Sequence, residues 1–254
     1  MKFEKWQALG NDYLIVEAVG LDPERVRALC DRHRGVGADG VLTLAPPDEP
    51  GYVARLRIYN PDGSEAELSG NGARQALLYL RQRGWTRSLT YSIQTLAGEI
   101  RASITGEHSC RTDMGRATLS GEGEVEGWPY YHIVVGNPQT AIRIAERHRL
   151  ETLDLAEIGP PIENAEIFPN RTNVSFWTGI APDRIRARIF ERGVGETQSS
   201  GTGACGAAVA HVLRGGDSPV MVELDGGELT VDVDESLHVD LEGWAVPVFR
   251  GEVE

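Results

Sequence analysis

Apolar and polar positions alternate in short runs along the chain, and the runs are separated by glycine-containing turns. Alternation over residues 53–59 and 185–190 predicts two strands. Each is followed by a Ser-Gly-x-Gly sequence and then by small apolar residues at helical spacing, which predicts helices over residues 73–83 and 204–214. Another helix is predicted to begin at Asp22-Pro23, an N-cap and first-turn pair, and to end near Gly35. Strand signals outnumber helix signals.

The sequence repeats itself at a constant offset of 131 residues. Residues 58–76 align with residues 189–207 without a gap, and seven pairs are identical. In both halves a Gly-Asn pair precedes the Ser-Gly-x-Gly sequence and a Gly-Glu pair follows it. Self-similarity of this kind indicates a duplicated structural unit. The identical pairs are Ile58/Ile189, Glu65/Glu196, Ser69/Ser200, Gly70/Gly201, Gly72/Gly203, Ala73/Ala204 and Ala76/Ala207.

The repeat predicts the architecture. We expect an α+β fold with two similar, pseudo-symmetric domains, each a curved, mostly antiparallel sheet around one central helix. The repeat places an N-terminal domain at residues 1–118 and a C-terminal domain at residues 119–254. A return of the last strand to the sheet of the first domain stays open.

Composition narrows the class of partner. The chain has 25 basic and 38 acidic residues, a net charge of −13, which argues against nucleic acid or an anionic membrane as a partner. No apolar run is long enough to span a bilayer, and no signal-peptide pattern is present, so we expect a cytoplasmic protein. Three scattered cysteines exclude a disulfide scaffold and a paired-cysteine zinc site. We expect no metal.

The two Ser-Gly-x-Gly sequences offer an anion site. At a strand-to-helix junction the first backbone N–H groups lack helical acceptors, and glycine lets a ligand approach them closely. The positive end of the helix dipole adds attraction for a carboxylate or phosphate. A single motif of this kind is typical of a capped helix. Two copies related by duplication favour one shared anion site if the domains face each other.

A pair of equivalent groups on two sides of a substrate suits the inversion of a stereocentre. One group removes the α-proton from one face, and the other delivers a proton to the opposite face. Ser69 and Ser200 occupy equivalent positions in the two halves, so the repeat points to racemisation or epimerisation. A serine alone is a poor base, and no His or Lys lies within the two motifs to activate it.

These motifs resemble the diaminopimelate epimerase family over nearly the whole chain. The resemblance implies two similar α/β domains that close over a cleft. It also implies cofactor-independent interconversion of LL- and meso-2,6-diaminopimelate in lysine and peptidoglycan synthesis. The expected partner is a small amino-acid substrate, and a homodimer stays open. The matching segments are residues 9–12, 32–40, 60–67, 70–74, 136–138, 173–174, 191–193 and 195–198.

Carried over residue by residue, the resemblance assigns the two catalytic positions to Ser69 and Ser200. It implies that Arg192 pairs with the distal carboxylate of the substrate and Glu191 with the distal ammonium. The reacting carboxylate is expected on backbone amides at the start of the two helices. The full set of expected substrate contacts is Asn11, Asn60, Gly70, Asn71, Asn137, Asn173, Glu191, Arg192, Gly201 and Thr202.

The chain departs from the family at its catalytic positions, where the family has two cysteines. Gln139 also stands where the family usually has a histidine, and Cys205 is expected to be a buried helix residue. Three interpretations stay open. The chain is a natural serine-bearing epimerase, on the same or another substrate; or a catalytically impaired or engineered Cys-to-Ser form; or a diamino-acid binding protein without catalysis.

Overall fold

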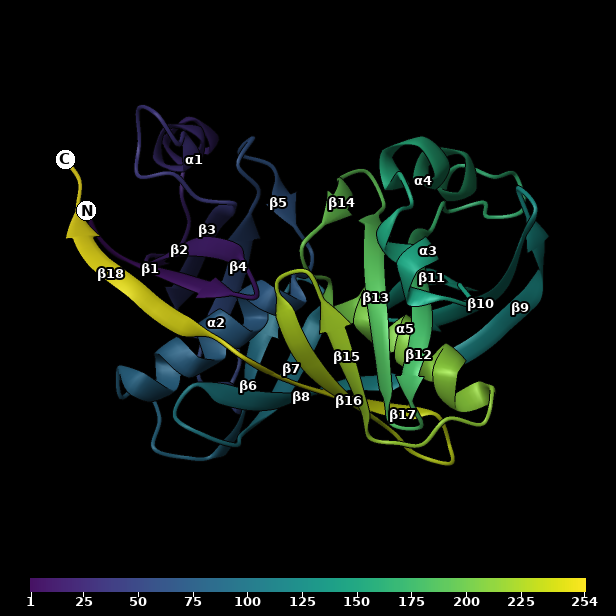
Figure 1. Ribbon diagram of the computed structural model, residues 1–254. Coiled ribbons are helices and arrows are strands. Elements are labelled where there is room, and N and C mark those ends of the chain that lie inside the picture. Colours follow the sequence, from purple (N-terminus) through teal and green to yellow (C-terminus); the bar gives the residue numbers. More distant parts are fainter. The chain divides into compact units, whose positions relative to one another are not determined.

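The computed structural model describes residues 1–254, with eighteen strands and five helices. The chain forms two compact units, one of residues Met1–Thr112 with Gly243–Glu254 and the other of residues Asp113–Glu242. The chain leaves the first unit within β8 (Ser109–Arg116) and returns to it within β17 (His238–Trp244) (Figure 1).

Both chain ends belong to the sheet of the first unit. Strand β18 (Val246–Glu252) pairs antiparallel with β1 (Lys2–Ala8), and the two termini lie side by side in Figure 1. A division at residue 118 would leave β18 with the second repeat, whereas its pairing with β1 places it in the first unit.

The sheet of the first unit is mostly antiparallel. Its strands are hydrogen-bonded in the order β18, β1, β2, β3, β4, β6, β7, β8, with β5 attached to β4. Only β2–β3 and β4–β6 are parallel. The remaining elements are β2 (Asn11–Glu17), α1 (Pro23–Cys30), β3 (Gly40–Ala45), β4 (Arg55–Tyr59), β5 (Glu65–Ala66), α2 (Gly70–Gln82), β6 (Thr90–Thr95) and β7 (Gly98–Ile104).

The second unit repeats this connectivity. Its strand order is β9, β10, β11, β12, β13, β15, β16, β17, with β14 attached to β13. The parallel pairs, β11–β12 and β13–β15, lie on either side of the β12–β13 hairpin, which is equivalent to the β3–β4 hairpin of the first unit. The elements are β9 (Thr118–Val125), β10 (Trp128–Val135), β11 (Asn137–Arg143), α3 (Arg147–Glu151), α4 (Leu155–Glu163), β12 (Asn173–Ala181), β13 (Arg184–Glu191), β14 (Gly195–Thr197), α5 (Gly201–Leu213), β15 (Val220–Leu224) and β16 (Gly227–Val233).

One helix lies at the centre of each unit. In α2, residues 71–80 are all buried, and α5 is buried along most of its length because small residues such as Ala207 and Ala208 let the sheet approach it closely. Helix α5 is apolar on nearly all sides, and such a helix needs this enclosure. The predicted α+β fold with a mostly antiparallel sheet around a central helix is confirmed in both units, as are the two helices after the Ser-Gly-x-Gly sequences.

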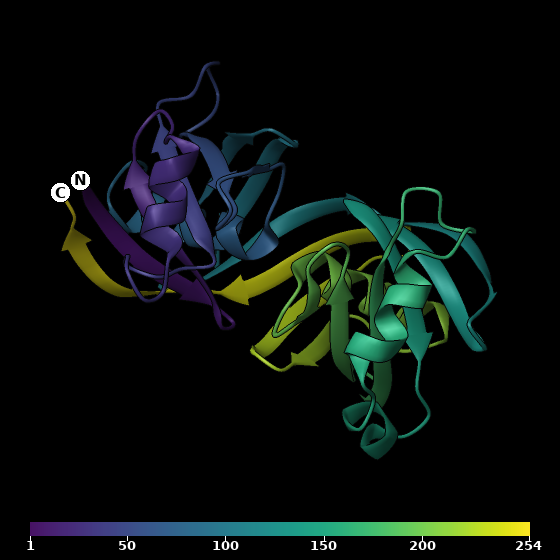
Figure 2. The same cartoon turned by 90° about the horizontal axis from the view of Figure 1, so that it is seen from above.

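A second core lies between the sheet and the outer helix or helices of each unit. In the first unit, Val26 and Leu29 of α1 pack with Phe3 and Leu14 of the sheet. In the second, α3 and α4 cover a cluster around Phe176. The purple helix α1 and the green helix α4 lie over their own units in Figure 2. None of the five helices is long and apolar enough to cross a membrane.

The first outer helix is shorter than its sequence pattern predicts. Helix α1 begins at Pro23 as expected, with Asp22 accepting a hydrogen bond from Glu24 N, but it ends at Cys30 rather than near Gly35. The carboxylate of Asp31 accepts hydrogen bonds from the backbone N–H groups of His33 and Arg34, both at 2.8 Å. Aspartate stabilises a turn in this way, so the helix stops one residue before it.

Candidate active site

Ser69 and Ser200 are the N-cap residues of the two central helices. Their backbone conformations are nearly the same, with φ and ψ of −138° and 117° at Ser69 and −137° and 123° at Ser200. The Ser69 Oγ accepts a hydrogen bond from Gly72 N at 3.0 Å, and the Ser200 Oγ accepts one from Gly203 N at 3.3 Å. Capping fixes both hydroxyl groups in equivalent places.

The predicted carboxylate-binding amides belong to the first turn of each helix. Gly70 and Asn71 open α2, and Gly201 and Thr202 open α5. The first intrahelical backbone bonds run from Ala73 N and Ala204 N to the two capping serines. The amides before them have no acceptor within the helix, and they carry the positive end of its dipole. Each helix start can therefore bind an anionic oxygen.

Tyr13, which the sequence analysis does not single out, lies beside Ser69. It is a buried residue of β2, and its hydroxyl group donates a hydrogen bond of 3.3 Å to the Ser69 Oγ. A signal for it exists in the chain, because Tyr13 follows Asn11 by two residues and so shares its face of the strand. The contact itself joins residues 56 positions apart.

Gly40 of β3 leaves the space that the Tyr13 ring occupies. A β-carbon at this position would lie 2.6 Å from Tyr13 Cε1 and 2.3 Å from the carbonyl oxygen of Tyr59. The second contact is with backbone, which cannot rotate away. Gly40 is thus a packing residue for Tyr13 and indirectly for Ser69.

Gly40→Ala is expected to lower the free energy of unfolding by about 1–3 kcal/mol, the usual cost of overpacking a filled core. Urea unfolding followed by circular dichroism measures this change. Gly121→Ala is the control, since a β-carbon there would have no heavy atom within 4 Å. Equal stability of the two variants would contradict the packing role of Gly40.

Glu191 lies beside Ser200. Its half-buried carboxyl group, at the end of β13, accepts a 2.9 Å hydrogen bond from Thr197 Oγ1 and is also hydrogen-bonded to the Ser200 hydroxyl. Burial raises the pKa of Glu191 above the ordinary carboxyl value, and the hydrogen bonds from Thr197 and Ser200 lower it by less. A carboxyl group with a raised pKa next to a serine is suited to exchanging a proton with it. The resemblance to the family assigns Glu191 only to the substrate ammonium group.

The predicted asparagines are held by hydrogen bonds within their own units. In the first unit, Asn11 Nδ2 donates to Asp39 Oδ2 at 2.9 Å and Asn60 Nδ2 donates to Ser64 Oγ at 3.0 Å. Gln75 of α2 donates to the carbonyl oxygen of Asn11 at 3.0 Å. These bonds tie the start of β2 to the central helix that Ser69 caps.

In the second unit, Asn173 is hydrogen-bonded to the backbone of Arg192 and to the residue that follows Asn137. Its Oδ1 accepts from Arg192 N at 2.9 Å, and its Nδ2 donates to the Pro138 carbonyl oxygen, next to Asn137, at 3.0 Å. The Asn137 side chain accepts from Gln139, which is fully buried. The Arg192 guanidinium donates to the Asn170 carbonyl oxygen at 2.7 Å. Arg192 and Glu191 are consecutive, so Ser200, Glu191, Arg192 and Asn173 are connected.

Cys205 is fully buried in α5, as predicted, and Cys30 and Cys110 are also buried and free. Burial raises the pKa of the Cys30 thiol to about 11, with nearby Asp12 adding to the effect. A thiol with so high a pKa is a poor nucleophile and base at neutral pH.

One cluster offers three atoms of the kind that bind metals. Asp113, His238 and Asp240 each present an oxygen or nitrogen, and all three atoms lie within 4.8 Å of one another. His238 Nε2 lies 3.0 Å from Asp113 Oδ1, an ordinary ion-pair distance for half-exposed groups. None of these residues is among the predicted site residues.

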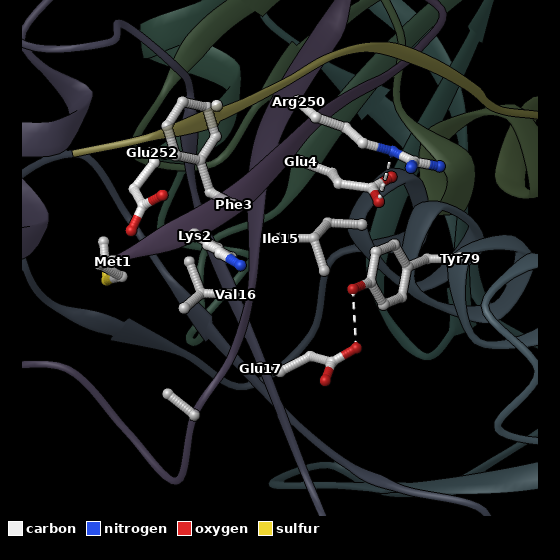
Figure 3. A pocket seen from close by; sticks show the side chains of 12 residues that line it. Met1, Lys2, Phe3, Glu4, Ile15, Val16, Glu17, Tyr79, Arg250 and Glu252 are labelled. Carbon is white, nitrogen blue, oxygen red and sulfur yellow. Dashed lines mark hydrogen bonds and ion pairs between the residues drawn. The ribbon is translucent and has the colours of Figure 1, made fainter.

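A groove on the first unit lies between β1, β2, β18 and α2 and has a volume of about 700 Å³ (Figure 3). Three of its charged groups have partners: Glu4 pairs with Arg250 and also with Arg83 outside the groove, and Glu17 accepts from Tyr79 at 2.9 Å. No predicted site residue lines it. The groove therefore offers no support for the chemistry expected at Ser69.

The fold class is found among racemases, epimerases and related isomerases. A probable proline racemase from Agrobacterium radiobacter has a TM-score of 0.73 at 14% identity and covers 100% of this chain and 92% of its own. A predicted epimerase from Pseudomonas aeruginosa has a TM-score of 0.73 at 15% identity, with 99% and 98% covered. At these identities the likeness shows the fold.

Sequence comparison gives the family. The family model for diaminopimelate epimerase matches residues 3–120 and 131–246. A diaminopimelate epimerase from Magnetococcus marinus is 40% identical over 274 residues, which cover 99% of this chain and 96% of the relative. One from a Synechococcus strain is 39% identical over 280 residues, with 99% and 97% covered. The chain belongs to the diaminopimelate epimerase family and is an isomerase of the racemase and epimerase type.

Proposed function

We propose that this chain is a cofactor-independent epimerase that interconverts LL- and meso-2,6-diaminopimelate, with Ser69 and Ser200 as its two acid/base groups. The observation that carries this proposal is the equivalence of the two serines. Each caps the central helix of its own repeat with the same backbone conformation, in a chain whose family inverts an α-carbon. Such an enzyme would serve lysine and peptidoglycan synthesis in the cytoplasm.

The substrate carboxylate next to the reacting carbon would bind to the helix starts. Amides of Gly70 and Asn71, and of Gly201 and Thr202, are the donors we assign to it. As the α-proton leaves, negative charge develops on this carboxylate, and preorganised N–H groups stabilise that charge more than they stabilise the substrate. This lowers the barrier for a proton that is otherwise weakly acidic.

Ser200 would reach the basicity that a serine lacks through Glu191. When the Ser200 oxygen takes the α-proton, the proton of its own hydroxyl group passes to the Glu191 carboxylate, so that no free alkoxide has to form. The raised pKa of Glu191 supports this role, because it brings the carboxyl group closer to the working pH. We therefore assign Glu191 to proton transfer rather than to the distal ammonium.

The distal end of the substrate would bind to Arg192 and the asparagines. A guanidinium group pairs with a carboxylate through two parallel hydrogen bonds, which fixes orientation as well as position. Asn173 holds the backbone of Arg192, and Asn11, Asn60 and Asn137 are the remaining contacts that we propose for the substrate.

Incubation of the protein with LL-diaminopimelate in deuterated water tests this function. We expect the α-proton signal in the NMR spectrum to disappear and meso-diaminopimelate to appear, and we expect Ser69→Ala/Ser200→Ala to show neither. Thermal stabilisation by the ligand without any exchange at high protein concentration would contradict the proposal. It would favour the other candidate, a diamino-acid binding protein. This candidate is tested because serine replaces both family cysteines.

A further inference from the structure

The two serines have different hydrogen-bond surroundings although their backbones are equivalent. A hydroxyl group has one proton to donate and two lone pairs that accept. In the first unit, the Ser69 oxygen accepts from Gly72 N at 3.0 Å and from the Tyr13 hydroxyl at 3.3 Å. Both lone pairs are used, so the proton of Ser69 is what the group can offer to a ligand.

The second unit has the opposite arrangement. The Ser200 oxygen accepts from Gly203 N at 3.3 Å, and its hydroxyl group acts as a hydrogen-bond donor that lowers the pKa of the Glu191 carboxyl group. An ionised carboxylate only accepts, so the proton of Ser200 points to Glu191. The remaining lone pair of Ser200 is what this group can offer to a ligand.

We infer that the two serines are set in opposite proton-transfer roles by these neighbours: Tyr13 is a positioning residue that makes Ser69 the proton donor, whereas Glu191 makes Ser200 the proton acceptor. This inference deepens the proposed epimerase function and rests on it for its catalytic meaning. The hydrogen-bond neighbours of the two serines therefore differ between the repeats. The position that holds Asn60 in the first repeat holds Glu191 in the second.

The protons balance in the resulting sequence. Ser200 takes the α-proton and passes its own proton to Glu191, which becomes neutral. Ser69 gives its proton to the opposite face of the carbon and receives the Tyr13 proton, so Tyr13 becomes a tyrosinate. A phenol is a stronger acid than an alcohol, which favours this second transfer over a bare serine alkoxide. The reverse reaction runs through the same steps backwards, from the form with neutral Glu191 and ionised Tyr13, so that Ser69 accepts and Ser200 donates. Between turnovers, solvent returns one proton to Tyr13 and removes one from Glu191.

Single cysteine substitutions at positions 69 and 200 test these roles, because the pKa of each new thiol depends on the neighbours of that position. A thiolate at position 69 would accept hydrogen bonds from Tyr13 and Gly72, which favour the charged form. A thiolate at position 200 would face the Glu191 carboxylate, and a like charge disfavours it. We therefore expect the thiol of Ser69→Cys to titrate at least about one pH unit below that of Ser200→Cys. The ultraviolet absorbance of the thiolate reports this, with the wild type as background for its three buried cysteines.

Second variants assign the difference to the two neighbours. Adding Tyr13→Phe to Ser69→Cys should raise the thiol pKa, and adding Glu191→Gln to Ser200→Cys should lower it. Tyr79→Phe is the matched control, because Tyr79 is as buried as Tyr13, at 6% exposed, and its hydroxyl group bonds Glu17 instead. Equal thiol pKa values at positions 69 and 200, or a Ser69→Cys value that ignores Tyr13→Phe, would overturn the inference.

The thiol titration and the exchange assay test the polarity of the serines and the epimerase function separately. The thiol pKa values need no substrate, so the expected difference without α-proton exchange would leave the polarity standing and remove the epimerase function. Exchange by the wild type that Tyr13→Phe leaves unchanged would remove the role of Tyr13 alone. In the epimerase, Tyr13→Phe should lower kcat about tenfold or more with little change in KM, since Tyr13 acts through Ser69 in this inference.

Discussion

Replacing Ser69 and Ser200 together by cysteine is expected to raise the rate of α-proton exchange by about 10²–10⁴-fold, the usual contribution of a well-matched general acid or base. A thiol has an ordinary pKa near 8.5, and the N-terminus of a helix lowers it. A serine hydroxyl group ionises far above the working pH. Both cysteines would cap helices whose first amides already bind the substrate carboxylate in our proposal. NMR in deuterated water at matched enzyme concentration measures the gain.

The control adds two thiols elsewhere. Ser88→Cys/Ser236→Cys places one exposed cysteine in each unit away from the helix starts and should leave exchange at the wild-type rate. A gain of similar size in this control, or none in the double variant at 69 and 200, would show that the two capping positions do not limit proton transfer.

The same substitution should cost stability. Serine is among the preferred N-cap residues, whereas sulfur is a weak hydrogen-bond acceptor. Loss of the bonds to Gly72 N and Gly203 N should lower the free energy of unfolding by about 1 kcal/mol at each helix. At positions 69 and 200, serine is therefore expected to give higher folding stability, and cysteine a higher rate of proton exchange.

The sequence is sufficient for the architecture because duplication is visible as identity at a fixed offset. Seven identities in residues 58–76 and 189–207 define one strand, one turn and one helix twice, and the remaining strands follow the same connectivity. At least one glycine of the repeat is needed for packing, because a β-carbon at Gly203 would lie 2.7 Å from Ile189 Cδ1. The return of β18 to β1 leaves no such trace, because its partner strand lies at the other end of the chain.

The site is less accessible to sequence reasoning. Positions of the serines and of the helix amides follow from the motif, since a cap and a first turn are local features. The partners of the serines do not follow from the motif. Tyr13 contacts Ser69 from a strand 56 residues earlier, and its only signal in the sequence is its place two residues after Asn11 in β2. Glu191 is near Ser200 in sequence, but its burial, which raises its pKa, depends on the packing of β13.

Glu191→Gln is expected to lower α-proton exchange by about 10²–10⁴-fold, because glutamine keeps the shape of the side chain but cannot take the proton of Ser200. The NMR assay measures the loss. Glu196→Gln, which removes an exposed carboxylate paired with Arg188 at 2.6 Å, is the matched control and should exchange at the wild-type rate. Full exchange by Glu191→Gln would return Glu191 to the role of a contact for the substrate ammonium.

The same variant should be more stable than the wild type at neutral pH. Burial raises the pKa of Glu191 in the folded chain above its unfolded value, so the folded state binds this proton more tightly. The resulting stabilisation is present below the unfolded pKa and is lost as the pH rises through the folded pKa. The Tm of Glu191→Gln should thus exceed that of the wild type above this range, with the gap shrinking as the pH falls below the ordinary carboxyl value. A gap that widens on acidification would mean that the ionised carboxylate stabilises the fold, which would remove the physical basis for its action as a base.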